Sequence, residues 1–217
     1  MTSVLADFTI FIPCRRNSKG IPFKNRRLFD FTLQSIPPEY HNNILVSTDD
    51  EVLAQKCQEL HIRYYARSPQ SARDEASTRE VLQETMSQIN TRYVIMLYVT
   101  YPERAWEHVV GAIEFYQQHE GKSMLCSKKL KTSPYLMMRK TGRCGRQLIE
   151  HDLYRRQDYP ECFEISHYIF ITMAKEVNNL NNNLYNKDTL FYPIDDVIDV
   201  DTPQDWENFN ANNKNNS

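Results

Sequence analysis

Short apolar runs that alternate with longer amphipathic segments constrain the fold of this chain more than any other feature. Three runs are aromatic and β-branched enough to predict buried strands, at residues 8–13, 44–47 and 93–97. Weaker strand candidates lie at residues 63–66, 123–127 and 168–172. Between the strands, apolar residues recur at helical spacing, in residues 52–60, 81–89 and 109–116. This alternation predicts an α/β fold: a Rossmann-like, mostly parallel sheet with helices on both faces, which binds ligands at the carboxyl ends of its strands.

The same rhythm predicts one domain over residues 1–210 of the 217-residue chain. Residues 128–165 interrupt it, because they are basic, contain two glycines and show no clean periodicity; we interpret them as a small excursion from the main domain. A last helix is predicted to start with Thr202 as its N-cap and Pro203 at the first helical position. The asparagine-rich residues 211–217 are predicted to be a disordered tail.

Composition excludes several classes of function. The chain has 26 Lys and Arg against 28 Asp and Glu, and its net charge of −2 predicts no nucleic-acid partner. Every apolar stretch is shorter than the roughly 20 residues that a membrane helix needs, which predicts no membrane insertion. The five cysteines form no CxxC pair, so we expect reduced thiols. Together with an N-terminus unlike a signal peptide, these features predict a cytoplasmic protein.

A basic loop follows the first predicted strand. Residues 15–25 read RRNSKGIPFKN, with four cations and two asparagines at the edge of the sheet where ligands are expected. Lysine and arginine neutralise polyphosphate, and backbone N–H groups near Gly20 can donate to phosphate oxygens. The alternative is a solvated basic surface loop. The loop is neither a Walker A motif, GxxxxGK[ST], nor a GxGxxG fingerprint.

Two aspartates near the C-terminus are candidate metal ligands. We predict that Asp199 and Asp201 lie in a strand, where residues two apart point to the same face, so that both carboxylates converge on one site. Two carboxylates facing a triphosphate are a usual Mg²⁺ arrangement, in which waters and phosphate oxygens complete the coordination. The alternative for Asp201 is capping of the helix that follows. Asp195 and Asp196 are predicted to be loop surface.

Five motifs, in order along the chain, resemble those of the acylneuraminate cytidylyltransferases, the CMP-sialic acid synthetases. They are SKGIPFKN at 18–25, VSTDD at 46–50, Arg67 followed by DEAST at 74–78, RRQD at 155–158, and IDVDT with Asp205 at 198–205. The resemblance implies a fold of the nucleotide-diphospho-sugar transferase type and a homodimer, with residues 128–165 as the dimerisation excursion. It also implies cytidylyl transfer from CTP to a nonulosonic acid, a nine-carbon α-keto acid sugar, with Mg²⁺ as cofactor and pyrophosphate as leaving group.

The resemblance further implies roles for individual residues. Those implied in catalysis are Arg15, Lys24, Arg155 and Arg156, and those implied for Mg²⁺ are Asp199 and Asp201. CTP is expected to contact Arg15, Ser18, Lys19, Gly20, Lys24, Asn25, Arg67, Ser77 and Thr78. The acceptor sugar is expected to contact Tyr98, Thr100, Gln157, Ser166 and His167. From the residues alone, Arg155 and Arg156 also fit a basic surface turn, and His167 fits a hydrogen-bonded structural histidine.

The departures from the family pattern concern mainly the acceptor. Tyr98 stands where the family's LLQPTSPLR has glutamine, and a phenol does not reproduce the donor–acceptor pair of an amide. ISHYIF at 165–170 replaces PNGAIY, and residues 25–31 lack the usual GKPLI. We therefore expect an altered nonulosonic acid or another sugar. Two alternatives stay open: a related nucleotidyltransferase for a different sugar or nucleotide, and a non-catalytic homologue that binds nucleotide or a partner protein.

Overall fold

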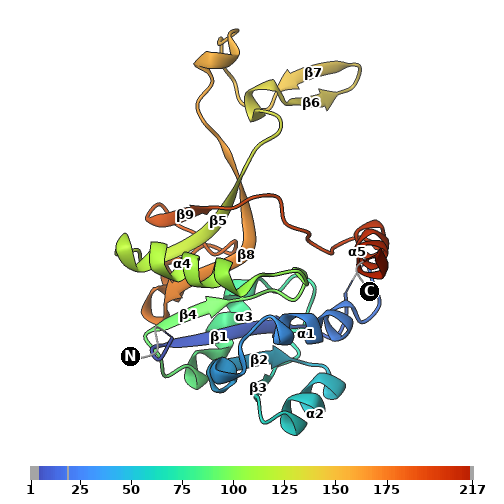
Figure 1. The fold of residues 1–217 in the computed structure, drawn as a ribbon. Coiled ribbons are helices and arrows are strands. Elements are labelled where there is room, and N and C mark those ends of the chain that lie inside the picture. The colour runs from blue at the N-terminus through green and yellow to red at the C-terminus, as the bar shows by residue number, and fades with distance from the viewer. Residues whose placement is uncertain (1–4, 19, 216–217) are drawn as a thin grey trace.

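The computed structural model describes residues 5–18 and 20–215, and within them seven strands form one mixed sheet and two more form a separate hairpin (Figure 1). The order in the sheet is β3-β2-β1-β4-β8-β5-β9, and β8 runs antiparallel to β4 and β5 while the other pairs are parallel. The mostly parallel α/β sheet predicted from the sequence is therefore confirmed. The strands are β1 (Phe8–Cys14), β2 (Ile44–Thr48), β3 (Arg63–Ala66), β4 (Tyr93–Met96), β5 (Ser123–Lys129), β6 (Met138–Thr141), β7 (Cys144–Gln147), β8 (Phe163–Met173) and β9 (Thr189–Pro193).

Helices cover both faces of the sheet. The α-helices are α1 (Lys24–Gln34), α2 (Glu51–Glu59), α3 (Thr78–Thr85), α4 (Trp106–Gln118) and α5 (Pro203–Asn215). Short 3₁₀ helices are η1 (Pro38–Asn43), η2 (Met86–Gln88), η3 (Pro134–Leu136), η4 (Arg156–Asp158) and η5 (Ala174–Asn179). Because side chains alternate along a strand, Ile10 and Ile12 pack in the core with α1, α2, α4 and α5, whereas Phe11 packs on the opposite face with α3 and η5. The result is a three-layer arrangement.

Most predicted elements agree with the structure, and the differences have physical reasons. The three predicted helical segments correspond to α2, α3 and α4, but Val52 and Leu60, at 50% and 46% exposure, do not face the core as expected, whereas Leu53 and Cys57 do. Proline does not end the first strand, because β1 includes Pro13 and continues to Cys14. The Phe11 carbonyl accepts from the Leu97 N–H, which is the last hydrogen bond on the β4 side of β1. Residues two apart in a strand direct their backbone groups to the same side, so the nitrogen of Pro13 also faces β4, beyond the last pair. Its missing N–H therefore costs no hydrogen bond in the sheet.

The C-terminal helix starts where the sequence predicts and continues further than expected. The Thr202 hydroxyl accepts from the Asp205 N–H at 3.2 Å, while the Asp205 carboxylate accepts from the Thr202 N–H at 2.8 Å, which is a reciprocal cap. The prediction of a disordered tail from residue 211 is wrong for residues 211–215, because the helical backbone of α5 continues through Asn215. Residues 216 and 217 lie outside the described residues.

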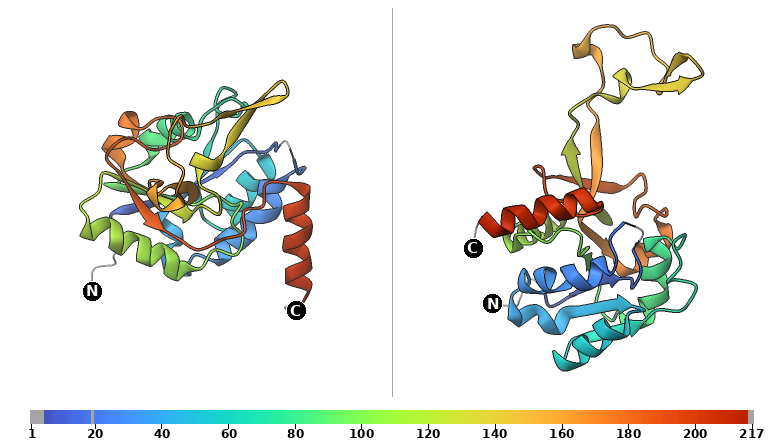
Figure 2. Two further views of the ribbon diagram at one scale, coloured as in Figure 1. Left: turned by 90° about the horizontal axis from the view of Figure 1, so that it is seen from above. Right: turned by 90° about the vertical axis from the view of Figure 1, so that its right-hand side faces the viewer.

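Residues 130–162, which we call the lobe, leave the sheet between β5 and β8 and carry the β6–β7 hairpin. The lobe projects away from the central sheet on two long strands (Figure 2). At its base, Lys129 of β5 pairs with Phe163 of β8. The excursion predicted at 128–165 therefore corresponds to a distinct projection in the structure. Among the described residues, the helices are all too short or too polar to cross a membrane.

Candidate functional site

A cavity of about 230 Å³ lies beside the carboxyl ends of β1 and β4. The sequence-predicted residues that line it are Arg15, Asn25, Arg67, Thr78, Tyr98 and Thr100. They come from the loop after β1, the first turn of α1, the segment after β3, the start of α3 and the loop after β4. The sheet order places β1 between β2 and β4, so these segments meet at one edge although they are far apart in sequence.

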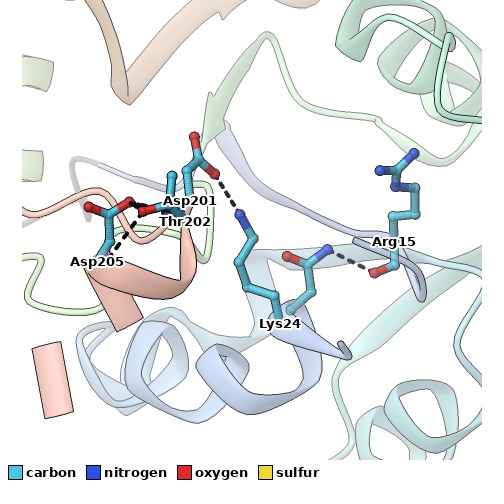
Figure 3. A network of polar contacts seen from close by, with 6 residues as sticks. Arg15, Lys24, Asp201, Thr202 and Asp205 are labelled. Carbon is cyan, nitrogen blue, oxygen red and sulfur yellow. Dashed lines mark hydrogen bonds and ion pairs between the residues drawn. The ribbon is translucent and has the colours of Figure 1, made fainter. Parts of the chain in front are cut away.

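The basic loop after β1 is tied down at both ends rather than solvated throughout. The Asn25 side-chain amide donates to the Arg15 carbonyl at 2.8 Å, which closes the loop on itself (Figure 3). The Arg16 N–H donates to Asp49 Oδ1 at 2.7 Å, and the Arg15 guanidinium forms an ion pair with Asp74. These contacts hold the side chain of Arg15 beside the cavity.

Asp50, in the loop after β2, anchors the far end of the same basic segment. Its carboxylate accepts from Arg26 Nε at 3.0 Å and Nη2 at 2.7 Å, and it caps α2 by accepting from the Val52 N–H at 3.0 Å. Burial alone would raise the pKa of the Asp50 carboxyl. The hydrogen bonds from Arg26 and Val52 outweigh that effect and lower this pKa. Asp50 therefore stays ionised and couples α1 to α2.

Phe23, the residue before α1, adopts the left-handed backbone conformation with φ of 54°. For a bulky residue this conformation is unfavourable by about 1–2 kcal/mol. The Arg26 guanidinium lies 4.6 Å from the Phe23 ring centroid, and Asp50 holds Arg26 in turn. The turn directs the next residue, Lys24, into the site, where it is only 7% exposed and its Nζ donates to Asp201 Oδ1 at 2.5 Å (Figure 3).

The expectation that Asp199 and Asp201 lie in a strand is wrong. Residues 194–201 form an irregular segment between β9 and α5, because no hydrogen-bonded ladder extends that far. The segment is nevertheless fixed beside the cavity, since the Val200 N–H donates to the Thr100 carbonyl at 2.8 Å. Gly20 approaches it so closely that a Cβ there would lie 2.9 Å from the Asp201 carbonyl. Backbone contacts, rather than strand geometry, bring the two aspartates together.

The two carboxylates have different environments. Burial, and then the charge of Asp201, raise the pKa of the Asp199 carboxyl, while Thr100, Tyr101 and Lys24 lower it in part. Among the described residues, Asp199 Oδ1 is buried without a hydrogen-bond partner. Asp201 is exposed and engages Lys24; capping of α5 falls to Thr202. A buried, unpaired carboxylate oxygen next to a second carboxylate fits the donor set of a hard divalent cation. The part of the chain that the structure describes holds no cluster of three or more His, Cys, Asp or Glu poised to bind a metal.

Arg67 lies between β2 and the cavity. Its Nε donates to both the carbonyl and the hydroxyl of Ser47, each at 3.1 Å. Burial is the main cause of the lowered pKa of its guanidinium, and the neighbouring Asp49 opposes the decrease. Arg67 also lines the cavity, where a polar ligand can contact it.

We call Tyr98, Ser166 and His167 the acceptor wall after the role that the sequence predicts for them; Tyr98 lines the cavity, whereas Ser166, which is buried, and His167 are not among its lining residues. The Tyr98 hydroxyl donates to Thr78 Oγ1 at 2.8 Å, and its ring lies edge-on to His167 with centroids 5.7 Å apart. Burial raises the pKa of Tyr98 to about 12, so the phenol is neutral near pH 7. His167 Nε2 lies 3.3 Å from the Asn183 carbonyl, and Ser166 Oγ lies 3.5 Å from the Tyr101 hydroxyl.

A register shift in β8 shapes this wall. Phe170 lies opposite Leu125 and Ser166 lies opposite the next residue, Cys126, so residues 167–169 bulge out of the pairing. Such bulges redirect side chains next to functional sites. Here the bulge turns His167 toward Tyr98 and buries Tyr168.

Other predicted residues lie apart from the cavity lining. Ser77 caps α3 in a capping box with Glu80, so its hydroxyl is already engaged. Ser18 and Gly20 lie in the basic loop but do not line the cavity, and Lys19 lies outside the described residues. The structure places Arg155, Arg156 and Gln157 in the lobe, away from the cavity of their own chain, and Arg155 pairs with Asp158 at 2.7 and 2.9 Å.

Sequence reasoning missed one buried residue beside the site, Arg104. It follows β4 and is 4% exposed, and its guanidinium bonds the carbonyls of Tyr98 and Tyr168. The signal available was its place in the segment that resembles LLQPTSPLR; a single arginine in a sequence does not reveal that it is buried.

Comparisons with known proteins agree with this architecture. A family model described as cytidylyltransferase matches residues 9–168. N-acylneuraminate cytidylyltransferases of Streptococcus agalactiae serotypes V and III are each 28% identical over 213 residues, which cover 90% of this chain and 50% of theirs. The chain thus spans about half the length of these curated relatives.

Solved structures share the fold at low sequence identity. A CMP:2-keto-3-deoxy-manno-octonic acid synthetase complexed with CTP superposes with a TM-score of 0.68 at 14% identity, covering 98% of this chain and 100% of that one. A 4-diphosphocytidyl-2C-methyl-D-erythritol synthase from Anaerococcus prevotii gives 0.64 at 12% identity, covering 99% and 100%. The nucleotide-diphospho-sugar transferase type of fold is therefore confirmed.

Proposed function

We propose that this chain, which belongs to the cytidylyltransferase family, transfers a cytidylyl group from CTP to the anomeric hydroxyl of a nonulosonic acid, with Mg²⁺ as cofactor. The observation that carries the proposal is the meeting of six predicted contact residues on one cavity, with Lys24, Asp199 and Asp201 beside it. Thr100 connects the cavity to the two aspartates. It lines the cavity, and its carbonyl accepts from the N–H of Val200, which lies between Asp199 and Asp201.

In this proposal, the acceptor oxygen attacks the α-phosphorus of CTP. A new oxygen–phosphorus bond forms, the bond between the α-phosphorus and the bridging oxygen breaks, pyrophosphate leaves with that oxygen, and the proton of the attacking hydroxyl passes to solvent water. Arg15 and Lys24 neutralise charge on the phosphates, and fixed cations are most effective when they are held before the substrate arrives. The contacts of Asn25 with the Arg15 carbonyl and of Lys24 with Asp201 hold the two cationic residues in this way.

Mg²⁺ is proposed to bind Asp199 and Asp201. The ion commonly takes one or two carboxylates and completes its shell with waters and substrate phosphates, so a two-carboxylate site suits it. When bound, it would neutralise the triphosphate and stabilise charge that develops during transfer. The buried, unpaired Oδ1 of Asp199 supports this assignment.

The cytosine and ribose are proposed to occupy the cavity between Arg67 and Thr78. The acceptor is proposed to lie against Tyr98, Ser166 and His167. Because the single O–H of Tyr98 is donated to Thr78, this phenol favours an acceptor whose substituent donates a hydrogen bond to it or stacks on its ring.

We further infer a homodimer joined through the lobe. Large apolar side chains of the lobe are exposed, including Met138, Leu148 and Tyr154 at 58%, 58% and 86%, and clustered exposed apolar residues are typical of interaction surfaces. In a dimer, Arg155 and Arg156 could reach the acceptor site of the other copy. Sedimentation of the wild type and of a Leu148→Glu variant tests this: a dimer that the variant weakens supports it, and a monomeric wild type contradicts it.

The activity is tested by mass spectrometry of products after mixing the protein with CTP, Mg²⁺ and a panel of nonulosonic acids. Parallel reactions contain GTP or UTP, with hexose 1-phosphates. A metal-dependent CMP-sugar supports the proposal. Product with another nucleotide or sugar identifies a related nucleotidyltransferase. Thermal stabilisation by CTP without any product supports the nucleotide site and contradicts the proposed acceptor, and a protein that CTP neither stabilises nor reacts with favours the non-catalytic homologue.

A further inference from the structure

A buried arginine joins the two segments that carry the acceptor wall. Arg104 Nη2 donates to the Tyr98 carbonyl at 2.6 Å, and Arg104 Nε donates to the Tyr168 carbonyl at 3.2 Å. Tyr98 belongs to the loop after β4, and Tyr168 belongs to the bulge of β8. One rigid guanidinium fork therefore bridges these segments just beyond the last β4–β8 pair, Met96 with Phe170, where the strand ladder no longer holds them.

The guanidinium is buried at this contact, since Arg104 is 4% exposed. It lies 5.7 Å and 5.3 Å from the ring centroids of Tyr101 and Tyr168. Burial lowers its pKa to about 10, so it remains charged near pH 7. Among the described residues its Nη1 is buried without a hydrogen-bond partner. A charge this deeply buried is expensive to maintain; its hydrogen-bond partners are main-chain carbonyls, and the charge of Asp199 helps to keep it protonated.

The residues that follow Arg104 fix the bulge from the same side. The Tyr168 hydroxyl contacts the Ala105 N–H at 3.3 Å and His108 Nδ1 at 2.8 Å. In the loop after β4, the Tyr98 hydroxyl donates a hydrogen bond to Thr78, and the Tyr98 ring makes a T-shaped contact with His167. Displacement of the Tyr98 backbone would therefore move the wall, whereas Arg15 and Asn25, on the nucleotide side, have supports of their own.

We propose that Arg104 is a positioning residue that fixes the acceptor wall and so sets the affinity for the acceptor, without contacting CTP. This inference rests on the proposed function. It predicts that loss of Arg104 weakens acceptor recognition far more than nucleotide recognition.

The test compares Arg104→Met and Arg104→Lys with a matched control, Arg79→Met. Arg79 resembles Arg104, because its Nη1 donates to the Leu180 carbonyl at 2.6 Å and its Nε is buried without a partner among the described residues, but it joins α3 to the segment after η5. Steady-state kinetics are measured with CTP and N-acetylneuraminate, or with the acid of the panel that the wild type accepts. Temperatures are kept well below the melting point of each variant.

We expect Arg104→Met to raise the acceptor KM by about tenfold or more while the CTP KM changes less than about threefold. Arg104→Lys should recover part of the loss, because it keeps the charge and one donor to a carbonyl. Arg79→Met should leave both KM values within about twofold of wild type. Equal changes in the two KM values, or an unchanged acceptor KM in Arg104→Met, would overturn the proposal.

A second measurement separates this inference from the proposed activity. Hydrogen–deuterium exchange with mass spectrometry follows peptides that cover residues 97–104 and 163–170. Faster exchange of both peptides in Arg104→Met, but not in Arg79→Met, supports the clamp even if the wild type accepts no acid of the panel. Unchanged exchange in both peptides overturns it, whatever the outcome for the activity.

Discussion

Replacement of Asp50 by alanine should destabilise the fold and loosen the basic loop. The Asp50 side chain is 1% exposed and serves two functions, since it caps α2 and accepts two hydrogen bonds from Arg26. Loss of an N-cap typically lowers the free energy of unfolding by about 1 kcal/mol, and loss of buried hydrogen bonds to a charged group by about 1.5–3 kcal/mol. We expect a total of about 3 kcal/mol, or a melting temperature lower by about 9 °C for a chain of this size.

Urea denaturation at pH 7 measures this difference, with Asp30→Ala as the control. Asp30 forms an ion pair with Lys56 at the surface, where its side chain is 49% exposed, so its loss should change stability by less than about 0.5 kcal/mol. An Asp50→Ala effect below about 1 kcal/mol would contradict the reasoning.

The pH dependence gives an independent check. The pKa of Asp50 is lowered in the folded protein, so its contribution is present above the pKa of the unfolded chain and is lost as pH falls through the folded value. Asp50→Asn keeps the cap but removes the charge. The difference in free energy of unfolding between the wild type and this variant should therefore be at its maximum at pH 7 and should decrease below about pH 4. A difference that persists unchanged at pH 3 would show that the charge of Asp50 is not involved.

Three further predictions concern the site. Asp199→Asn should raise the melting temperature at pH 7, because it removes a buried charge from a carboxyl whose pKa is raised. It should also abolish CMP-sugar formation. Scanning calorimetry and product assays check these results, and a lowered melting temperature would refute the first. Gly20→Ala should reduce turnover, because its Cβ would lie 2.9 Å from the Asp201 carbonyl, whereas Gly111→Ala, whose Cβ meets only the flexible end of Tyr192, should keep wild-type turnover. Tyr98→Phe should raise the KM for the acceptor by about fivefold, about 1 kcal/mol, because the Tyr98 ring loses the hydrogen bond to Thr78 that holds it in the acceptor wall, and an unchanged acceptor KM would contradict this.

The fold could be predicted from the sequence wherever periodicity reports burial. The apolar strands β1, β2 and β4 were predictable, because central strands of a parallel sheet are apolar on both faces. The helix α1 was not predicted, because its sequence KNRRLFDFTLQ buries Leu28 and Phe29 among charged residues. The edge strand β9 was also missed, since half-exposed edge strands carry a weaker apolar signal.

The candidate site was predictable where function follows the end of a strand. Arg15 and Thr100 lie in the loops that follow β1 and β4, which are neighbouring strands, so topology alone brings them together. The placement of Asp199 depends on a backbone hydrogen bond to a distant loop, and the role of Arg104 depends on its burial; neither leaves a local pattern in the sequence. Individual catalytic and binding roles remain predictions that the experiments above test.

The pairing of Lys129 with Phe163 at the base of the lobe makes residues 130–162 a removable module. Antiparallel partners lie about 5 Å apart, so a short turn can reconnect them without stretching β5 or β8. The same boundary permits grafting: lobes of related proteins can be exchanged at this pair while the central sheet, the cavity and the acceptor wall keep their own sequence. A set of such chimeras would separate what the lobe recognises from what the central sheet and its cavity recognise.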